Sequence, residues 1–186
     1  MSQQFARRWF SVGEYQRMAE TGILTEDDRV ELIEGEIIEM SPIGRRHAAC
    51  VKRLNALLGR RLGPSVIVSV QDPIYLNDFS EPEPDIALLR PCEDFYEQVL
   101  PAASDVLLIV EVADTSVDYD RNKKLPLYAR AGIPEMWLVD LSAHTITIYA
   151  QPLNGQYQLV ETFKRGEPIT AQTLAGLTLP VDQILG

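Results

Sequence analysis

The stretch DVLLIVEV, residues 105–112, decides the fold that this sequence predicts. Its run from Val106 to Val110 is short and apolar on both faces, which is typical of a strand in the centre of a sheet. The run ends abruptly at Glu111, and a carboxylate is costly to bury without a cation, hydrogen-bond donors or an opening to water. We therefore expect a central strand over residues 105–112 that carries at its mouth a carboxylate in need of a partner.

The stretch EPDIALL, residues 83–89, repeats this pattern upstream, because Pro84 and Asp85 precede a short apolar strand expected over residues 86–89. Two neighbouring strands that each offer a carboxylate can hold one hard cation. Mg²⁺ suits this arrangement because it takes few protein oxygens and keeps several waters. The sequence thus predicts a metal site made by Asp85 and Glu111, with the backbone carbonyl of Val112 as a further ligand. Either carboxylate alone would be an ordinary acid at a strand end.

A pair of lysines follows the predicted metal site, at Lys123 and Lys124. A lysine beside a metal site can orient a water and stabilise charge in the transition state. The two side chains point about 100° apart on a helix, so only one should face the carboxylates. We expect this helix over residues 119–131, closed by Gly132. Pro126 inside it lacks an N–H and clashes with the preceding turn, so the helix must start late or kink there.

The rest of the chain predicts helices and strands in alternation. A helix over residues 11–20 has Ser11 as its N-cap and Glu14 in a capping box, and Gly35 marks a hairpin within residues 30–40. An amphipathic helix over residues 47–62 stops at Gly63-Pro64. Further strands are expected over residues 66–70, 74–76, 136–139, 145–149 and 157–163, the last two joined by a turn at Asn154-Gly155. The predicted fold class is α/β, with a mixed sheet flanked by helices.

Length and composition indicate a single soluble domain over residues 1–186. No apolar run approaches the roughly 18 residues of a membrane span, and the start MSQQFARRWF lacks the apolar core of a secretory signal. We therefore expect a cytoplasmic protein without a membrane partner. The two cysteines, Cys50 and Cys92, are too few for a disulfide scaffold, and a zinc site made of Cys and His is not expected.

The net charge of −10 argues against a generic nucleic-acid coat, because a phosphate backbone usually binds to a cationic surface. The charge is unevenly distributed, however. Residues 45–61 contain no acidic side chain and carry six basic ones: Arg45, Arg46, Lys52, Arg53, Arg60 and Arg61. Either this segment is the solvated face of a helix or it contacts phosphates, and the sequence leaves both interpretations open.

Four stretches resemble the Uma family, described as putative restriction endonucleases, within the PD-(D/E)XK nuclease superfamily. They are VELIEGEIIEMSP followed by His47, then EPDIALL, IVEVADTS and DYDRNKKLPLYARAGIPEMWLVD, and the resemblance as a whole runs over residues 11–149. The resemblance implies a restriction-endonuclease-like core with an N-terminal helix and β-hairpin. It also implies hydrolysis of DNA phosphodiester bonds by a metal-activated water, with Mg²⁺ (or Mn²⁺) and no organic cofactor. A homodimer is expected by analogy, because two active sites commonly cut the two strands.

The resemblance also suggests which residues are catalytic. Asp85 and Glu111 match the two acids of the superfamily pattern, but Ala113 occupies the position of its lysine. In the Uma family a lysine of the next helix is thought to replace it, and this is Lys124, ahead of its neighbour Lys123.

The resemblance further implicates Glu31 and His47. Glu31 can accept a hydrogen bond from a metal-bound water or pair with an arginine such as Arg29 or Arg45. His47 lies near a helix N-terminus, where the dipole disfavours the protonated ring, so a neutral acceptor or a phosphate contact is reasonable. A structural role for His47 is the alternative.

Other readings remain open from the sequence. The acidic cluster Asp114, Asp118 and Asp120 is interpreted as loop and helix-capping chemistry rather than as extra metal ligands. Tyr128 is expected beside the site and Trp137 in the core. The competing functions are a catalytically inactive nuclease-fold module that binds DNA or another partner, and a nuclease directed at RNA.

Overall fold

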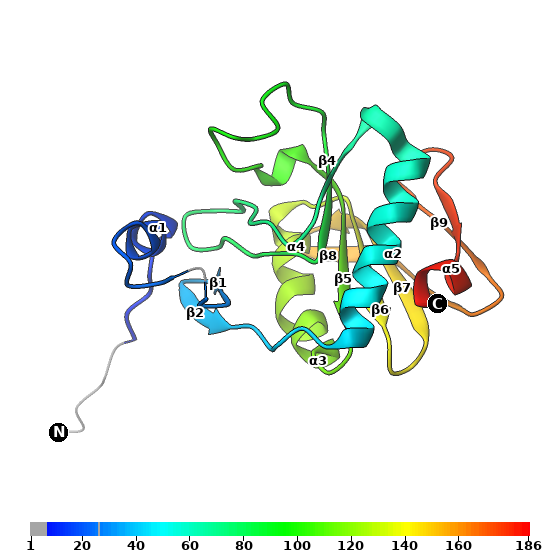
Figure 1. Cartoon of the computed structure of the whole chain (residues 1–186), viewed down its shortest axis with the longest axis horizontal. Helices are drawn as coiled ribbons and strands as arrows, with labels where there is room; N and C mark the ends of the chain where they lie inside the picture. Colours follow the sequence, from blue (N-terminus) through cyan, green and yellow to red (C-terminus); the bar gives the residue numbers. More distant parts are fainter. Residues whose placement is uncertain (1–6, 26) are drawn as a thin grey trace.

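A six-stranded mixed sheet forms the centre of the computed structural model, which describes residues 7–25 and 27–186 (Figure 1). The predicted domain 1–186 and the expected lack of a signal both include residues 1–6, which lie outside the described residues. The strands, in sheet order, are β3 (Ile67–Ser69), β4 (Ile86–Leu89), β5 (Val106–Ala113), β6 (Glu135–Asp140), β7 (Thr145–Leu153) and β8 (Gln156–Lys164). The predicted central strand is therefore confirmed as β5.

The sheet is mixed because β5 and β6 run parallel, while every other neighbouring pair is antiparallel. A parallel pair needs a crossover, and the helical segment between β5 and β6 supplies it. The antiparallel register pairs Ile86 with Val110, so the residue before β4 lies beside the residue that follows Val110. The start of β4 and the end of β5 therefore lie side by side at the same end of these two strands, which brings Asp85 next to Glu111.

The crossover consists of three helical pieces: α3 (Val117–Tyr119), a π-helical turn (Asp120–Lys124) and α4 (Leu125–Ala131). Pro126 lies at the beginning of α4, and the turn before it is widened, since the Leu125 N–H donates to the carbonyl of Asp120 five residues back. A π-type turn is a common way to insert a residue that an α-helix cannot accommodate. Gly132 ends α4 in the left-handed conformation at φ 78°, as predicted.

Helices cover both faces of the sheet (Figure 1). On one face, α2 (Arg45–Leu62) packs Leu54 and Leu58 against the sheet core, together with the hairpin β9 (Pro168–Thr170) and β10 (Thr178–Pro180) and with α5 (Val181–Leu185). On the other face, Tyr128 of α4 is packed with Ile109 and Met136. The predicted helix over residues 47–62 is confirmed and begins two residues earlier. The C-terminal hairpin and α5 were not predicted.

The N-terminal region lies to one side of the sheet, beyond α4 in the view of Figure 1. Helix α1 (Val12–Glu20) begins with the predicted capping box of Ser11 and Glu14. The predicted hairpin is also confirmed, as β1 (Val30–Ile33) and β2 (Glu36–Glu39). Gly35 turns it at φ 81°, and a Cβ there would lie 2.8 Å from Cβ of Trp9. A bridge between Leu32 and Glu81 ties the hairpin to the segment that leads into β4.

One predicted strand, over residues 74–76, is wrong. The segment folds back on itself instead, because the N–H of Ile74 donates to Pro82 and that of Leu76 to Ser80. Elsewhere the two-residue turn between β7 and β8 is confirmed, with both Asn154 and Gly155 at positive φ. Two 3₁₀ turns complete the described elements: Gly63–Ser65 and Ala103–Asp105.

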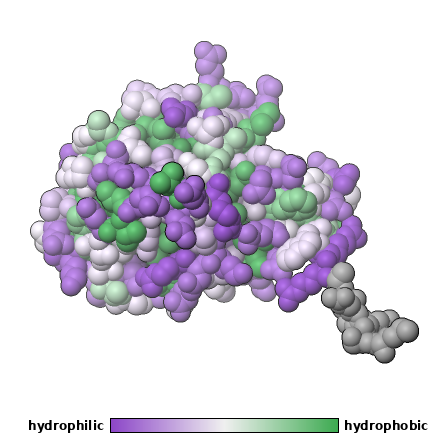
Figure 2. Space-filling model, turned by 180° about the vertical axis from the view of Figure 1, so that it is seen from behind, coloured by the Kyte–Doolittle hydropathy of each residue, from purple (hydrophilic) through white to green (hydrophobic). Residues whose placement is uncertain are grey.

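Figure 2 shows the face behind that of Figure 1, where hydrophobic side chains are interspersed with hydrophilic ones. Among the described residues, the exposed large hydrophobic side chains are spread over several segments: Trp9, Ile23, Ile43, Phe79, Phe95, Val99, Leu153 and Val160. Cys50 and Cys92 are both free thiols. Within residues 7–25 and 27–186, no helix combines the length and the apolar character that crossing a bilayer requires.

Candidate active site

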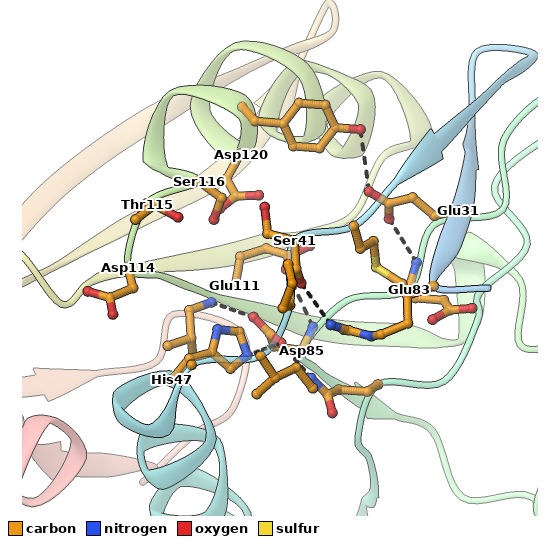
Figure 3. Close-up of a pocket in the computed structure, with 18 of the residues that line it drawn as sticks. Glu31, Ser41, His47, Glu83, Asp85, Glu111, Asp114, Thr115, Ser116 and Asp120 are labelled. Carbon is orange, nitrogen blue, oxygen red and sulfur yellow. Dashed lines mark hydrogen bonds and ion pairs between the residues drawn. The ribbon is translucent and has the colours of Figure 1, made fainter. Parts of the chain in front are cut away.

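A pocket of about 380 Å³ opens where β4 begins and β5 ends (Figure 3). Its walls include the five side chains that the sequence singled out, together with Val112: Glu31, His47, Asp85, Glu111 and Lys124. These residues come from β1, from the first turn of α2, from the residue before β4, from β5 and from the π-helical turn. Glu31 and Lys124 are 93 positions apart in the sequence, and both line this one pocket.

Asp85 is held by donors on both of its carboxylate oxygens. Oδ1 lies 2.7 Å from Nε2 of His47 and 3.1 Å from Nε2 of Gln71, and Oδ2 accepts a 2.8 Å hydrogen bond from the backbone N–H of Val112. His47 also forms a hydrogen bond with the backbone of Val112. Burial lowers the pKa of His47, but the hydrogen bond and charge of Asp85 outweigh it and raise the pKa above its ordinary value.

Glu111 is almost completely buried, with 3% of its surface exposed. Its Oε1 accepts a 2.6 Å hydrogen bond from the hydroxyl of Tyr128 and lies 3.1 Å from Nζ of Lys124. Its Oε2 accepts one long bond, of 3.4 Å, from the N–H of Asp85. Burial raises the pKa of the Glu111 carboxyl, although the charge of Lys124 lowers it. Glu111 thus keeps one oxygen that is only weakly occupied by protein donors.

Lys124 is the buried cation of the pocket. Its Nζ lies 3.0 Å from Oε2 of Glu31 and 3.1 Å from Oε1 of Glu111, whereas Lys123 is exposed. Burial lowers the pKa of Lys124, but the charges of Glu111 and Glu31 outweigh it and raise the pKa, so the lysine stays protonated. Of the two candidate lysines, Lys124 is therefore the one that faces the carboxylates.

Glu31 is 1% exposed, and its partner is this lysine rather than either arginine considered from the sequence. Its Oε1 also accepts from the Tyr119 hydroxyl at 3.3 Å, and its Oε2 accepts from the N–H of Glu83 at 3.2 Å. Lys124 consequently bridges Glu31 on one side of the pocket and Glu111 on the other. The hairpin of β1 and β2 thus contributes a charged group to a site whose other members come from the sheet, α2 and the π-helical turn.

Sequence reasoning missed several polar residues of the pocket. Tyr128, expected only to pack nearby, donates directly to Glu111. Gln71, which adopts a left-handed φ of 57°, donates to Asp85. Glu83 lines the pocket as well, and burial raises its pKa. The spacing of Tyr128 one helical turn after Lys124 was a usable signal, whereas nothing in the sequence marks the backbone conformation of Gln71.

The acidic cluster divides into residues with different roles. Asp114 lines the pocket and forms an ion pair with Arg46, and Asp118 is exposed. Asp120 lines the pocket as well, accepts a 2.9 Å hydrogen bond from the Ser116 hydroxyl, and is buried enough to raise its pKa to about 6. Two of the three acids therefore face the pocket, and the interpretation of the cluster as loop and helix-capping chemistry stays a prediction.

The donor atoms of the pocket suit a hard cation. Asp85 and Glu111 offer carboxylate oxygens side by side, and neither cysteine lines the pocket. Within the described part of the chain, no three His, Cys, Asp or Glu side chains form a ready metal-binding group. An ion held here would therefore take two protein carboxylates and complete its shell with water and backbone oxygen, which is how Mg²⁺ commonly binds.

A comparison with one solved structure agrees with this architecture. A crystal structure described as a putative nuclease belonging to DUF820, from Anabaena variabilis ATCC 29413, aligns with a TM-score of 0.77. It is 18% identical, and the alignment covers 95% of this chain and 97% of that one. The type IIG restriction endonuclease BpuSI aligns with a TM-score of 0.40 and 20% identity, over 63% of this chain and 14% of that one. No curated protein matches.

The sequence profile of the Uma2 family, described as "Putative restriction endonuclease", matches residues 12–182. The match begins at the first residue of α1 and ends within α5, so it includes every residue that lines the pocket. The fold of the Anabaena protein is the same restriction-endonuclease-like arrangement that the sequence predicted. This chain belongs to the Uma2 family.

Proposed function

We propose that this chain is a Mg²⁺-dependent endonuclease that hydrolyses phosphodiester bonds in DNA. The observation that carries the proposal is the convergence of Asp85, Glu111 and Lys124, with Lys124 held 3.1 Å from the Glu111 carboxylate. Ala113 leaves the usual lysine position of the superfamily empty, and Lys124 brings an equivalent charge to the carboxylates from the next helix. The family description supports the same class of reaction.

In this proposal Asp85 and Glu111 hold the Mg²⁺ ion. When bound, the ion supplies Lewis-acid stabilisation of the phosphate and lowers the pKa of water. Lys124 adds a fixed positive charge beside the scissile phosphate, and its two carboxylate partners fix the position of its ammonium group. Glu31 accepts a hydrogen bond from the attacking water, and His47 fixes the orientation of the Asp85 carboxylate.

The proposed substrate is duplex DNA, and the proposed assembly is a homodimer. The family description supports DNA as the substrate. One protomer has one Asp85–Glu111 pair, so cleavage of both strands in one encounter would use two protomers. Sedimentation of the protein with and without a DNA duplex tests the assembly separately from the chemistry.

The test of the proposed reaction is the relaxation of supercoiled plasmid in Mg²⁺, with EDTA as the metal-free control. The variants are Asp85→Asn and Lys124→Gln, and Lys123→Gln is the matched control because Lys123 is exposed. We expect the wild type and Lys123→Gln to nick DNA in Mg²⁺ only, and the other two to lose activity by on the order of 10²- to 10³-fold. Cleavage that survives in Asp85→Asn and Lys124→Gln would falsify the assignment.

The alternative is a nuclease-fold module without catalytic activity that binds DNA or another partner. The contact between His47 and Asp85 favours it, because a ring N–H at 2.7 Å occupies an oxygen that a metal would use. Calorimetric titration with Mn²⁺ discriminates the two proposals. Binding at micromolar to millimolar Mn²⁺ that is lost in Asp85→Asn supports the enzyme, and the absence of binding supports the module.

A further inference from the structure

Helix α2 concentrates the positive charge of this acidic chain. The net charge is −10, yet α2 contains six of the 17 basic residues and no acidic one. Two of the six have internal roles, since Arg46 pairs with Asp114 and Arg53 donates to the carbonyls of Ile184 and Leu185. The other four are exposed and form no ion pair with any residue of the described chain: Arg45, Lys52, Arg60 and Arg61.

Three of these exposed cations share one side of the helix. At 100° per residue, Arg45, Lys52 and Arg60 fall within an arc of about 80°, and the rise of 1.5 Å per residue spreads them over about 22 Å. The core side chains Leu54 and Leu58 point the opposite way, into the sheet. We call Arg45, Lys52 and Arg60 the cationic stripe. Because the residues between them include Ala49 and Ala56, little side-chain bulk separates one charge from the next.

The two ends of the stripe lie at two different hollows. At the first turn of α2, Arg45 directly follows Gly44, which lines the candidate active site, whereas the His47 side chain enters that site from the opposite side of the helix. From the middle of α2 to its last turn, Lys52, Arg60 and Arg61 line a second, open hollow against α5. The acidic residue of that hollow, Asp182, already pairs with Arg165 and accepts from the N–H of Gly166. The stripe therefore leads from the catalytic pocket to a hollow whose unpaired charge is positive.

Helix stability does not explain the first turn of α2. Gly44 is its N-cap and provides no side-chain acceptor, and the first turn contains Arg45 and Arg46 but no acidic residue. Cations there oppose the helix dipole and destabilise the helix. Arg46 is compensated by Asp114, whereas Arg45 faces solvent. An external anion is the partner that would satisfy it.

We propose that the cationic stripe of α2 binds the phosphate backbone of the DNA duplex whose scissile bond enters the active-site pocket. This inference rests on the proposed function, because it takes DNA as the substrate. Arg45 and Arg60 are 15 residues apart on the helix, or about 22 Å, which is the axial length of about six base pairs. The stripe thus sets a footprint of about six base pairs to one side of the cleaved bond. The net charge of −10 disfavours binding of DNA to the surface in general, so the duplex should favour the concentrated positive charge of the stripe.

The test is the salt dependence of DNA binding, measured by fluorescence anisotropy on a labelled 24-base-pair duplex in EDTA, so that cleavage cannot interfere. The stripe variant is Lys52→Gln/Arg60→Gln. The control is Arg17→Gln/Lys164→Gln, which removes the same charge from exposed cations of α1 and β8 that form no ion pair with the described residues. Each phosphate contact contributes about 0.9 to the slope of log K against log salt, so the stripe variant should lower the slope by about 1.8.

A slope lowered by about two contacts in the stripe variant and unchanged in the control supports the proposal. Equal slopes in the two double variants would overturn it. The same titration on an RNA duplex of the same sequence is a second check, and a slope that falls in the stripe variant on RNA but not on DNA would also overturn the proposal. The plasmid assay separates this failure from failure of the proposed function. Wild-type cleavage with equal slopes rejects the stripe alone, whereas a stripe-dependent slope without cleavage by any variant rejects the nuclease and keeps the DNA-binding surface.

Discussion

Two buried glutamates on the neighbouring parallel strands β5 and β6 satisfy their carboxylates in opposite ways. Glu135, the first residue of β6, is 0% exposed and accepts four hydrogen bonds from neutral donors. These come from the indole of Trp137, the backbone N–H groups of Gln172 and Thr173, and the Thr173 hydroxyl, at 2.7–2.8 Å. Glu111, near the end of β5, is 3% exposed and depends on a tyrosine, a lysine and one long backbone contact.

The difference teaches that burial of a carboxylate does not by itself mark a functional site. Glu135 is completed by protein donors alone, and it anchors the turn between β9 and β10 to the sheet. Glu111 shares a cation with Glu31, lines a pocket and keeps one oxygen weakly bonded. The two glutamates differ in how much hydrogen-bonding capacity of the carboxylate the protein leaves unused. Substitutions at each glutamate, or at one of its donors, test this difference.

The largest effect is expected for Glu111→Gln. The amide removes a metal ligand, so plasmid cleavage should fall by on the order of 10³-fold. The fold should tolerate the change, because Lys124 keeps its 3.0 Å ion pair with Glu31 and because burial already disfavours the charged form of Glu111. Cleavage rates and thermal melting of the same preparation check both statements. Near-wild-type cleavage, or a melting temperature that falls further than that of Glu135→Gln, would contradict the comparison.

Glu135→Gln should lower the stability of the fold and leave cleavage unchanged, the reverse of what is expected for Glu111→Gln. An amide has one acceptor oxygen in place of two, so at least one buried N–H of Trp137, Gln172 or Thr173 loses its partner, at a cost of about 2 kcal/mol. For a chain of this length, that cost lowers the melting temperature by roughly 4–8 °C. Urea denaturation measures the loss, and cleavage at 20 °C should match the wild type. A variant that keeps its stability but loses cleavage would mean that Glu135 acts at the site.

The sequence was sufficient to find Glu111 and insufficient to find Glu135. An apolar strand that ends in an acid next to a second such strand predicts two adjacent carboxylates, and register places Asp85 beside Glu111 as expected. Two of the four donors to Glu135 are backbone N–H groups 37 and 38 residues away, and backbone groups leave no residue signature. The same reasoning explains why the C-terminal hairpin escaped prediction.

The family resemblance favoured Lys124 over Lys123, but the helical periodicity of the sequence could not choose between them. A regular helix separates the two side chains by about 100°, but the π-helical turn changes the phase of the residues that follow. Pro126 signalled that the helix must deviate without showing how. The widened turn directs Lys124 into the pocket and leaves Lys123 in solvent. Periodicity alone therefore places the lysine pair near the site, and only the local backbone selects the member that enters it.

Tyr128→Phe should have an intermediate effect, because it removes the 2.6 Å hydrogen bond to Glu111 while keeping the ring. Tyr128 is a positioning residue in this view, so the Mg²⁺ concentration for half-maximal cleavage should rise by about 10-fold, with a smaller change at saturating metal. Tyr157→Phe is the matched control, since its hydroxyl donates to the carbonyl of Ile133 outside the pocket. An equal shift in both variants would assign the effect to general loss of packing.

The smallest effect is expected for Thr173→Val, which removes the hydroxyl that lies 2.8 Å from Glu135 and 3.0 Å from the carbonyl of Leu107. The backbone N–H groups of Gln172 and Thr173 still satisfy the carboxylate, so the free energy of unfolding should fall by about 1 kcal/mol without a change in cleavage. Thr170→Val is the control, because its hydroxyl pairs with Thr178 on an exposed surface and should cost less.

Combining Thr173→Val with Glu135→Gln in a double-mutant cycle measures the interaction energy between the Thr173 hydroxyl and the Glu135 carboxylate. If the hydroxyl stabilises the protein through the carboxylate, the double variant should lose at least about 0.5 kcal/mol less than the sum of the single losses. Additive losses would mean that the hydroxyl acts through Leu107 instead. A glutamate that neutral donors complete must be coupled to each of them, whereas Glu111 should show no coupling to Thr173. That absence of coupling is the strictest form of the contrast between the two carboxylates.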